Sequence, residues 1–227
     1  MNSIKLNEGG WSSAIKSQGH ILNANGIAWS EEHLKDEYNS ERGIGELWLL
    51  PNSISPRLLE LGIQNRIAGY DMPCSFTADN WNGKYILLCF QDPLRKWIKE
   101  SSLTMTSPFA LTNKRMREGK RSYGIVWGTV QKILETGYGA WVTDASKIWL
   151  NKRLGRIEEN KLAEINKETL IDEAKAIAPE KIVAFGGHAG SRLKKHVGDA
   201  YRITQLLHPA AWERDWSNFK PNTFSSD

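Results

Sequence analysis

Residues 85–93 read YILLCFQDP, an apolar run that ends abruptly at a turn. The run Tyr85–Phe90 is the longest uninterrupted apolar stretch in the chain, and six residues are too few to cross a membrane. Its length and its turn boundary are typical of a strand buried on both faces. Three more mostly apolar runs follow it and predict further strands, at Ala140–Thr143, Lys181–Phe185 and Arg202–Leu207.

Helical patterns lie between these strands, at Ser122–Glu135, Lys161–Ala178 and Ser191–Val197. Alternation of strand and helix favours parallel βαβ units with helices on both faces of one sheet. We therefore expect an α/β fold with three α/β/α layers around a central four-stranded parallel sheet.

The first 80 residues have a different pattern, of helices and loops. Ser30–Tyr38 is a predicted helix, with Ser30 as its N-cap and acidic residues in its first turn. A short apolar helix is expected at Leu58–Ile63. We expect a single domain over residues 1–227, with residues 1–80 as a helical extension and residues 81–227 as the α/β core.

Composition limits the class of protein. The chain has 227 residues, of which 40% are hydrophobic and 25% charged, which is typical of a globular protein and excludes collagen-like and wholly disordered classes. Two cysteines are too few for a disulfide framework, a four-cysteine zinc site or a cysteine-ligated iron–sulfur cluster. With neither a membrane span nor an apolar signal segment at the N-terminus, we expect a cytoplasmic protein.

Charge is distributed unevenly along the chain. Residues 1–80 carry six Lys/Arg and ten Asp/Glu, whereas residues 81–227 carry 24 and 16. The basic C-terminal part favours a polyanionic partner. Ten tryptophans are a high number; most are expected to serve packing, and one or two to stack on or wedge between nucleic-acid bases.

Chemically active side chains follow each predicted strand. They are Gln91 and Asp92 after the first, Asp144 after the second, the turn GGHAGS at 186–191 after the third, and His208 after the fourth. Since ligands bind beyond the carboxyl ends of parallel strands, we expect these groups to meet at one edge of the sheet. Each has an ordinary structural explanation as a turn or capping residue, and only their joint placement indicates a site.

The joint pattern resembles the uracil-DNA glycosylase superfamily over about Lys84–Trp216, three-fifths of the chain. The stretches that carry the resemblance are FQDP at 90–93, SPFAL at 107–111, WVTDASK at 141–147, KIVAFGGHAG at 181–190 and LLHPAAW at 206–212. The first 80 residues contribute nothing to it.

The resemblance implies roles for individual residues. A base must leave the duplex before its glycosidic bond can be reached. Asp92 would stabilise the oxocarbenium-like sugar and orient a water, and His208 would donate to the anion that develops at a pyrimidine O2. Gln91 would hydrogen-bond the base, Phe109 would stack on it, and Trp212 would fill the gap that the flipped nucleotide leaves.

Two departures from the family pattern concern the base. Asp144 stands where the family has a base-reading asparagine, and an ionised carboxylate can only accept, which suits the N4 amino group of cytosine. Leu94 replaces a tyrosine that excludes C5 substituents, and Arg95 next to it could meet hydroxyls or a phosphate. Together they favour a C5-modified cytosine, such as the glucosylated hydroxymethylcytosine of phage DNA, and hence a role in defence. In the competing interpretation Asp144 only caps a turn.

The resemblance also implies contacts with the DNA backbone. The basic run at 113–122 contains Lys114 and Arg115, and the helix after the glycine turn contains basic residues and a serine that we expect at its start. The candidates there are Gly187, Ser191, Arg192, Lys194 and Lys195. The ordinary alternative for such runs is a solvated face.

Three other functions remain open on the sequence: a conventional uracil-removing repair enzyme, a non-catalytic DNA-binding protein on the same fold, and a nucleoside hydrolase. No lysine stands in a clear Schiff-base setting, so we expect a monofunctional N-glycosylase that leaves an abasic site without cutting the strand. The expected partner is duplex DNA. We expect no metal, no organic cofactor and no membrane partner, and a monomeric protein.

Overall fold

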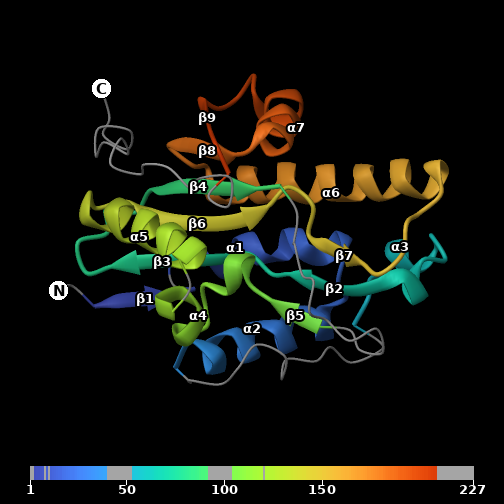
Figure 1. The fold of residues 1–227 in the computed structure, drawn as a ribbon, viewed down its shortest axis with the longest axis horizontal. Helices are drawn as coiled ribbons and strands as arrows, with labels where there is room; N and C mark the ends of the chain where they lie inside the picture. The colour runs from blue at the N-terminus through green and yellow to red at the C-terminus, as the bar shows by residue number, and fades with distance from the viewer. Residues whose placement is uncertain are drawn as a thin grey trace.

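The computed structural model describes residues 3–7, 9, 11–39, 53–91, 104–119 and 121–208, and two β-sheets organise this part of the chain (Figure 1). The larger sheet has six strands in the order β1-β3-β6-β4-β8-β9, and the smaller has three in the order β5-β2-β7.

The four predicted strands lie side by side in the larger sheet, and each matches its predicted bounds to within one residue. They are β4 (Tyr85–Phe90), β6 (Gly139–Asp144), β8 (Lys181–Phe185) and β9 (Ile203–Leu206). Strand β4 pairs in parallel with both β6 and β8, and β8 pairs in parallel with β9. The carboxyl ends of all four strands therefore meet at one edge.

The expected four-stranded, purely parallel sheet is nevertheless wrong, because the sheet is mixed and has six strands. Strand β3 (Cys74–Ala78) pairs antiparallel with β6, and β1 (Ile4–Leu6) pairs antiparallel with β3. Both come from residues 1–80, so that segment is more than a helical extension. These strands are short and lack a long apolar run, and their partners are distant in sequence.

The smaller sheet combines one strand from the first 80 residues, one that follows β4 along the chain and one that follows β6. Strand β2 (Ile67–Asp71) pairs in parallel with β5 (Thr104–Thr106) and antiparallel with β7 (Ile148–Leu150). Gly69 permits a close approach in this sheet, since a Cβ there would lie 2.0 Å from the carbonyl oxygen of Thr104.

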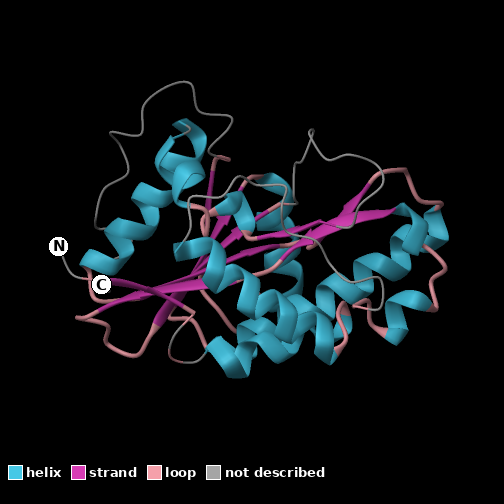
Figure 2. Cartoon of the chain, turned by 90° about the horizontal axis from the view of Figure 1, so that it is seen from below, coloured by secondary structure: helices cyan, strands magenta, loops and turns pink. Residues whose placement is uncertain are grey.

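Helices cover both faces of the larger sheet, which confirms the three-layer α/β/α arrangement (Figure 2). Alternation along β4 divides the core, because Leu87 and Cys89 belong to one apolar cluster and Leu88 and Phe90 to the other. The first face is covered by α1 (Trp11–Ala14), η1 (Ile15–His20), α6 (Arg156–Ile177) and α7 (Gly187–Val197), and the second by α5 (Arg121–Glu135).

Two helices of the N-terminal segment differ from the prediction. Helix α2 (Ala24–Asn39) begins six residues before Ser30, whose hydroxyl donates to the Gly26 carbonyl at 2.6 Å instead of capping a helix. The short α3 (Pro56–Leu59) replaces the helix expected at Leu58–Ile63. Its N-cap is Ser55, whose Oγ accepts from the Leu58 amide at 3.2 Å. A 3₁₀ turn, η2 (Gln64–Arg66), connects this region to β2.

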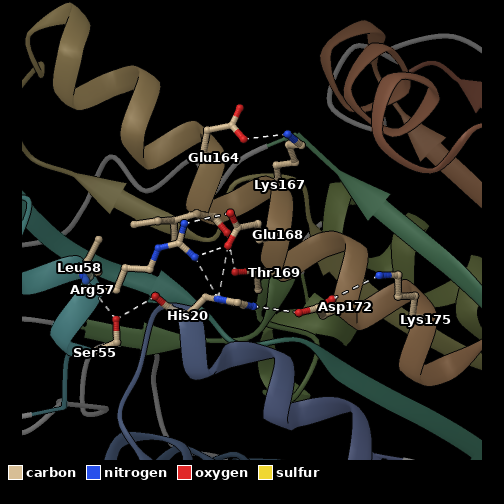
Figure 3. A network of polar contacts seen from close by, with 11 residues as sticks. His20, Ser55, Arg57, Leu58, Glu164, Lys167, Glu168, Thr169, Asp172 and Lys175 are labelled. Carbon is tan, nitrogen blue, oxygen red and sulfur yellow. Dashed lines mark hydrogen bonds and ion pairs between the residues drawn. The ribbon is translucent and has the colours of Figure 1, made fainter.

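A polar network joins the N-terminal segment to helix α6 (Figure 3). His20 Nε2 lies 3.0 Å from Asp172 Oδ2, and both terminal nitrogens of Arg57 donate to Glu168. These side chains are partly exposed, so each pair contributes little to stability. They link η1 and α3 to α6 across more than 100 positions of the sequence. Within the described ranges, no helix combines the length and apolar character that crossing a membrane requires.

Candidate active site

The ends of β4 and β6 bring two of the predicted site residues together. Phe90 and Asp144 are register partners, the last residues of their strands. The amide of Ser146 then donates to the carbonyl of Gln91 at 3.1 Å. Gln91 and the turn after Asp144 are thus hydrogen-bonded neighbours at the predicted edge.

Aromatic rings gather at the same edge, on the face of the sheet that α5 covers. Phe109 lies in the 3₁₀ turn η3 (Pro108–Ala110), and its ring centroid is 4.6 Å from that of Phe90 and 5.7 Å from that of His208. Phe185, at the end of β8, stacks on Phe90 at 4.7 Å. We call Phe90, Phe109, Phe185 and His208 the aromatic cluster. It unites two predicted site residues, Phe109 and His208, that are 99 positions apart in the sequence.

The backbone at Phe109 is unusual. Phe109 and Ala110 have φ angles of 51° and 46°, in the left-handed region that glycine favours. Such a conformation costs a non-glycine residue about 1–3 kcal/mol and is concentrated at functional sites. Phe109 is half-buried, whereas Phe90 and Phe185 are buried. The strained turn therefore presents a ring at the border of the core.

Asp144 is buried, and a buried ion pair between Lys147 and Glu173 supports the turn that follows it. The Nζ of Lys147 donates to the main-chain oxygen of Asp144 at 2.8 Å and to the hydroxyl of Thr143. The same ammonium group lies 2.8 Å from Oε2 of Glu173 on α6, and neither side chain is exposed. Glu173 also accepts from the indole N–H of Trp141. The conformation of the turn that carries Asp144 is thus tied to a buried ion pair.

The glycine turn lies beside His208. Gly186 has a φ of 91°, its amide donates to the Leu206 carbonyl at 2.8 Å, and a Cβ on it would lie 3.7 Å from the His208 Cβ. Helix α7 begins at Gly187, not at Ser191 as predicted. Ser191 is the fifth residue of the helix, so its amide is not among those left open at the helix start. The prediction that Ser191 stands at the helix start is therefore wrong, and that position belongs to Gly187.

Most of the basic residues that are predicted to contact the DNA backbone are exposed. Lys114 and Arg115 are exposed at the start of α4 (Lys114–Gly119), which directly follows the turn of Phe109. On α7, Lys194 and Lys195 are exposed and Arg192 is half-buried. Arg117, in the same basic run, is buried and has an internal role described below.

Several predicted residues are not placed by the structure, and others went unrecognised in the sequence. Asp92, Leu94, Arg95 and Trp212 lie outside the described residues. Three residues that support the site were not predicted: Glu37, Lys147 and Glu173. Lys147 belongs to the stretch WVTDASK at 141–147, which carries a signal, whereas the two glutamates lie in helices with no local signal.

Burial also decides the state of the two cysteines. Desolvation raises the pKa of the Cys74 and Cys89 thiols, so both remain neutral and unreactive at physiological pH. Among the residues that the structure describes, no three His, Cys, Asp or Glu side chains are grouped so that they could hold a metal ion.

The chain matches no protein-family model, and no curated protein is similar enough in sequence to be counted as a relative.

Proposed function

We propose that the chain is a DNA glycosylase that flips a nucleotide and hydrolyses its base–sugar bond, leaving an abasic site. The observation that carries this proposal is the meeting of Gln91, Phe109, Asp144 and His208 at one edge of the sheet, from four separate segments of the chain. A stacking ring, a buried carboxylate and an imidazole are the groups that reading and releasing an extruded base requires.

The base would lie against Phe109, with its polar edge toward Asp144. An ionised carboxylate accepts hydrogen bonds and does not donate them, so it matches the N4 amino group of cytosine and opposes the O4 of uracil. Leu94, in place of a tyrosine, would leave room for a substituent at C5. The proposed substrate is therefore a C5-modified cytosine, of which glucosylated hydroxymethylcytosine in phage DNA is an example. Removal of that base would serve defence against phage.

The reaction is a hydrolysis at C1′ of the sugar. The C1′–N bond breaks with its electron pair leaving on the base, and water supplies the new C1′–O bond. Asp92, one residue beyond Gln91, would stabilise the positive charge on the sugar and orient the water. His208 would donate to O2 of the departing base. Lys114 and Arg115 lie next to the turn of Phe109 and would bind the flanking phosphates.

A product assay tests the proposal. Matched duplexes would carry uracil, cytosine, hydroxymethylcytosine or glucosyl-hydroxymethylcytosine at one position, and alkali would break any abasic site. We expect cleavage of a modified-cytosine strand alone. Uracil cleavage would indicate an ordinary repair enzyme and overturn the proposed substrate, whereas DNA binding without cleavage would indicate a non-catalytic protein and overturn the glycosylase itself.

Two variants assign the chemistry. Asp92→Asn should lower the rate of base release by about a hundredfold or more, the range expected for a group that acts on the reacting atoms. Its matched control is Asp199→Asn, the same change at an exposed position. Asp144→Asn should lower kcat/KM on the modified cytosine by about ten- to a hundredfold, the usual discrimination of one base-reading contact.

A further inference from the structure

Helix α2 is hydrogen-bonded to the loop that contains Phe109. The carboxylate of Glu37 on this helix is buried between α2 and the loop of residues 107–113. It accepts from the hydroxyl of Thr112 at 2.5 Å and from the side-chain amide of Asn113 at 3.2 Å. Each of its two oxygens thus has a donor from this loop.

The hydrogen bonds continue from Thr112 to the start of the turn. The Oγ of Ser107 lies 2.9 Å from Oγ1 of Thr112 and accepts from the Thr112 amide at 3.1 Å. Because the Thr112 hydroxyl donates to Glu37, the Ser107 hydroxyl donates to Thr112. All of these side chains are buried. The chain of bonds therefore links α2 to both ends of the segment that contains Phe109.

Arg117 fixes the far side of the loop. Its Nη1 donates to the carbonyls of Leu111 and Thr112 at 3.3 and 3.2 Å. Its guanidinium lies over the rings of Tyr38 and Trp127, 4.6 and 5.0 Å from their centroids. Helices α2, α4 and α5 thus enclose the loop with buried polar and cation–π contacts.

This enclosure explains how the left-handed backbone at Phe109 and Ala110 persists. Non-glycine residues keep such angles only where surrounding contacts over-determine them. Within the turn, short-range amide bonds hold the backbone, such as the bond from the Ala110 N–H to the Ser107 carbonyl at 2.7 Å. The contacts from Glu37 and Arg117 supply the rest, and they come from outside the turn.

We propose that Glu37 is a positioning residue, which acts through Thr112 and Asn113 to hold the Phe109 ring where an extruded base stacks. Residues 1–80, whose role the sequence left open, would thereby complete the base pocket. This inference rests on the proposed glycosylase function.

The test compares Glu37→Gln with Glu32→Gln, the same change at an exposed position of the same helix. In Glu37→Gln one carboxylate oxygen becomes an NH₂ group, which faces the donor of either Thr112 or Asn113, so one of the two hydrogen bonds is lost and the other loses its charge. We expect amide hydrogens of residues 107–113 to exchange about tenfold faster in the free protein, with β4 and β8 unchanged, since a charged hydrogen bond of ordinary strength is lost. Glu32→Gln should leave both segments as in wild type.

Kinetics then separate positioning from general structure. Glu37→Gln should lower kcat/KM for base release about tenfold, and the loss should shrink to less than twofold in a Phe109→Leu background, because the ring through which Glu37 acts is gone. If Glu37→Gln fails to fold, Thr112→Val and its conservative partner Thr112→Ser repeat the comparison, and the serine should restore activity. Unchanged exchange, or an equal loss in both backgrounds, would overturn the inference. A wild-type protein that releases no base would instead overturn the proposed function.

Discussion

Replacing Lys147 by methionine should destabilise the fold severely. The ammonium group lies 2.8 Å from Glu173, and both side chains have no solvent exposure. Methionine has a similar length and apolar stem, so little packing is lost. What remains is a carboxylate buried without its counter-charge, and breaking a buried ion pair in this way costs about 3–5 kcal/mol. This cost includes the loss of the hydrogen bond from Lys147 to the Asp144 carbonyl.

Urea unfolding monitored by tryptophan fluorescence measures this cost. With a slope of roughly 2–3 kcal/mol/M, a loss of about 4 kcal/mol lowers the midpoint by roughly 1.5 M. Lys161→Met, at an exposed position of α6, is the matched control and should change stability by less than about 0.5 kcal/mol. The double variant Lys147→Met/Glu173→Gln should regain about 2 kcal/mol or more over the single variant, because it removes the unpaired charge while keeping an acceptor for Trp141.

A loss below about 1 kcal/mol for Lys147→Met would refute this reasoning. So would a double variant whose loss equals the sum of the two single losses, because independent effects would mean that the two side chains do not stabilise the fold as a pair.

Four further substitutions test other features. Gly69→Ala should lower the free energy of unfolding by about 1–3 kcal/mol, because its Cβ would meet backbone atoms. Gly128→Ala in α5, with open space around it, should raise it by about 0.5–1 kcal/mol. The midpoints of urea unfolding measure both changes. Ala178→Gly should add about 1 kcal/mol in the same assay, because Ala178 ends α6 with a φ of 41°. Burial, then the charge of Lys167, lowers the pKa of His196. The unfolded chain therefore takes up a proton first, and stability should fall as pH falls below about 6.5, with a shallower slope in His196→Gln at pH 7.5 to 5.5.

Strands β4, β6 and β8 could be predicted because they are buried and consist mostly of apolar residues. Strand β9 lies at the edge of the sheet and is only partly buried, so its signal is weaker. Strand β3 is also wholly buried, yet its five residues CSFTA include a serine and a threonine, so no such run marks it. Strand β1 has three residues and pairs with β3 some 70 positions later. Pairings of this kind depend on which distant segments meet, and local patterns carry no information about that.

Part of the candidate site was predictable for the same topological reason. Residues that follow parallel strands end at the same edge, so Gln91, Asp144 and His208 could be grouped before any coordinates were known. Glu37 could not be grouped with them, since it lies in a helix 75 positions before its partner Thr112.

Phe109 shows where local propensity fails and why. A turn with a φ of 51° predicts glycine or asparagine, so a phenylalanine there gives no sequence signal for the conformation. Glycine would adopt these angles without strain, but it would remove the ring that contacts Phe90 and His208. Phenylalanine thus keeps these ring contacts at the cost of a strained backbone. The buried bonds from Glu37 and Arg117 offset that strain from outside the turn, and the conformation at the site is therefore set by contacts that no window of sequence around Phe109 contains.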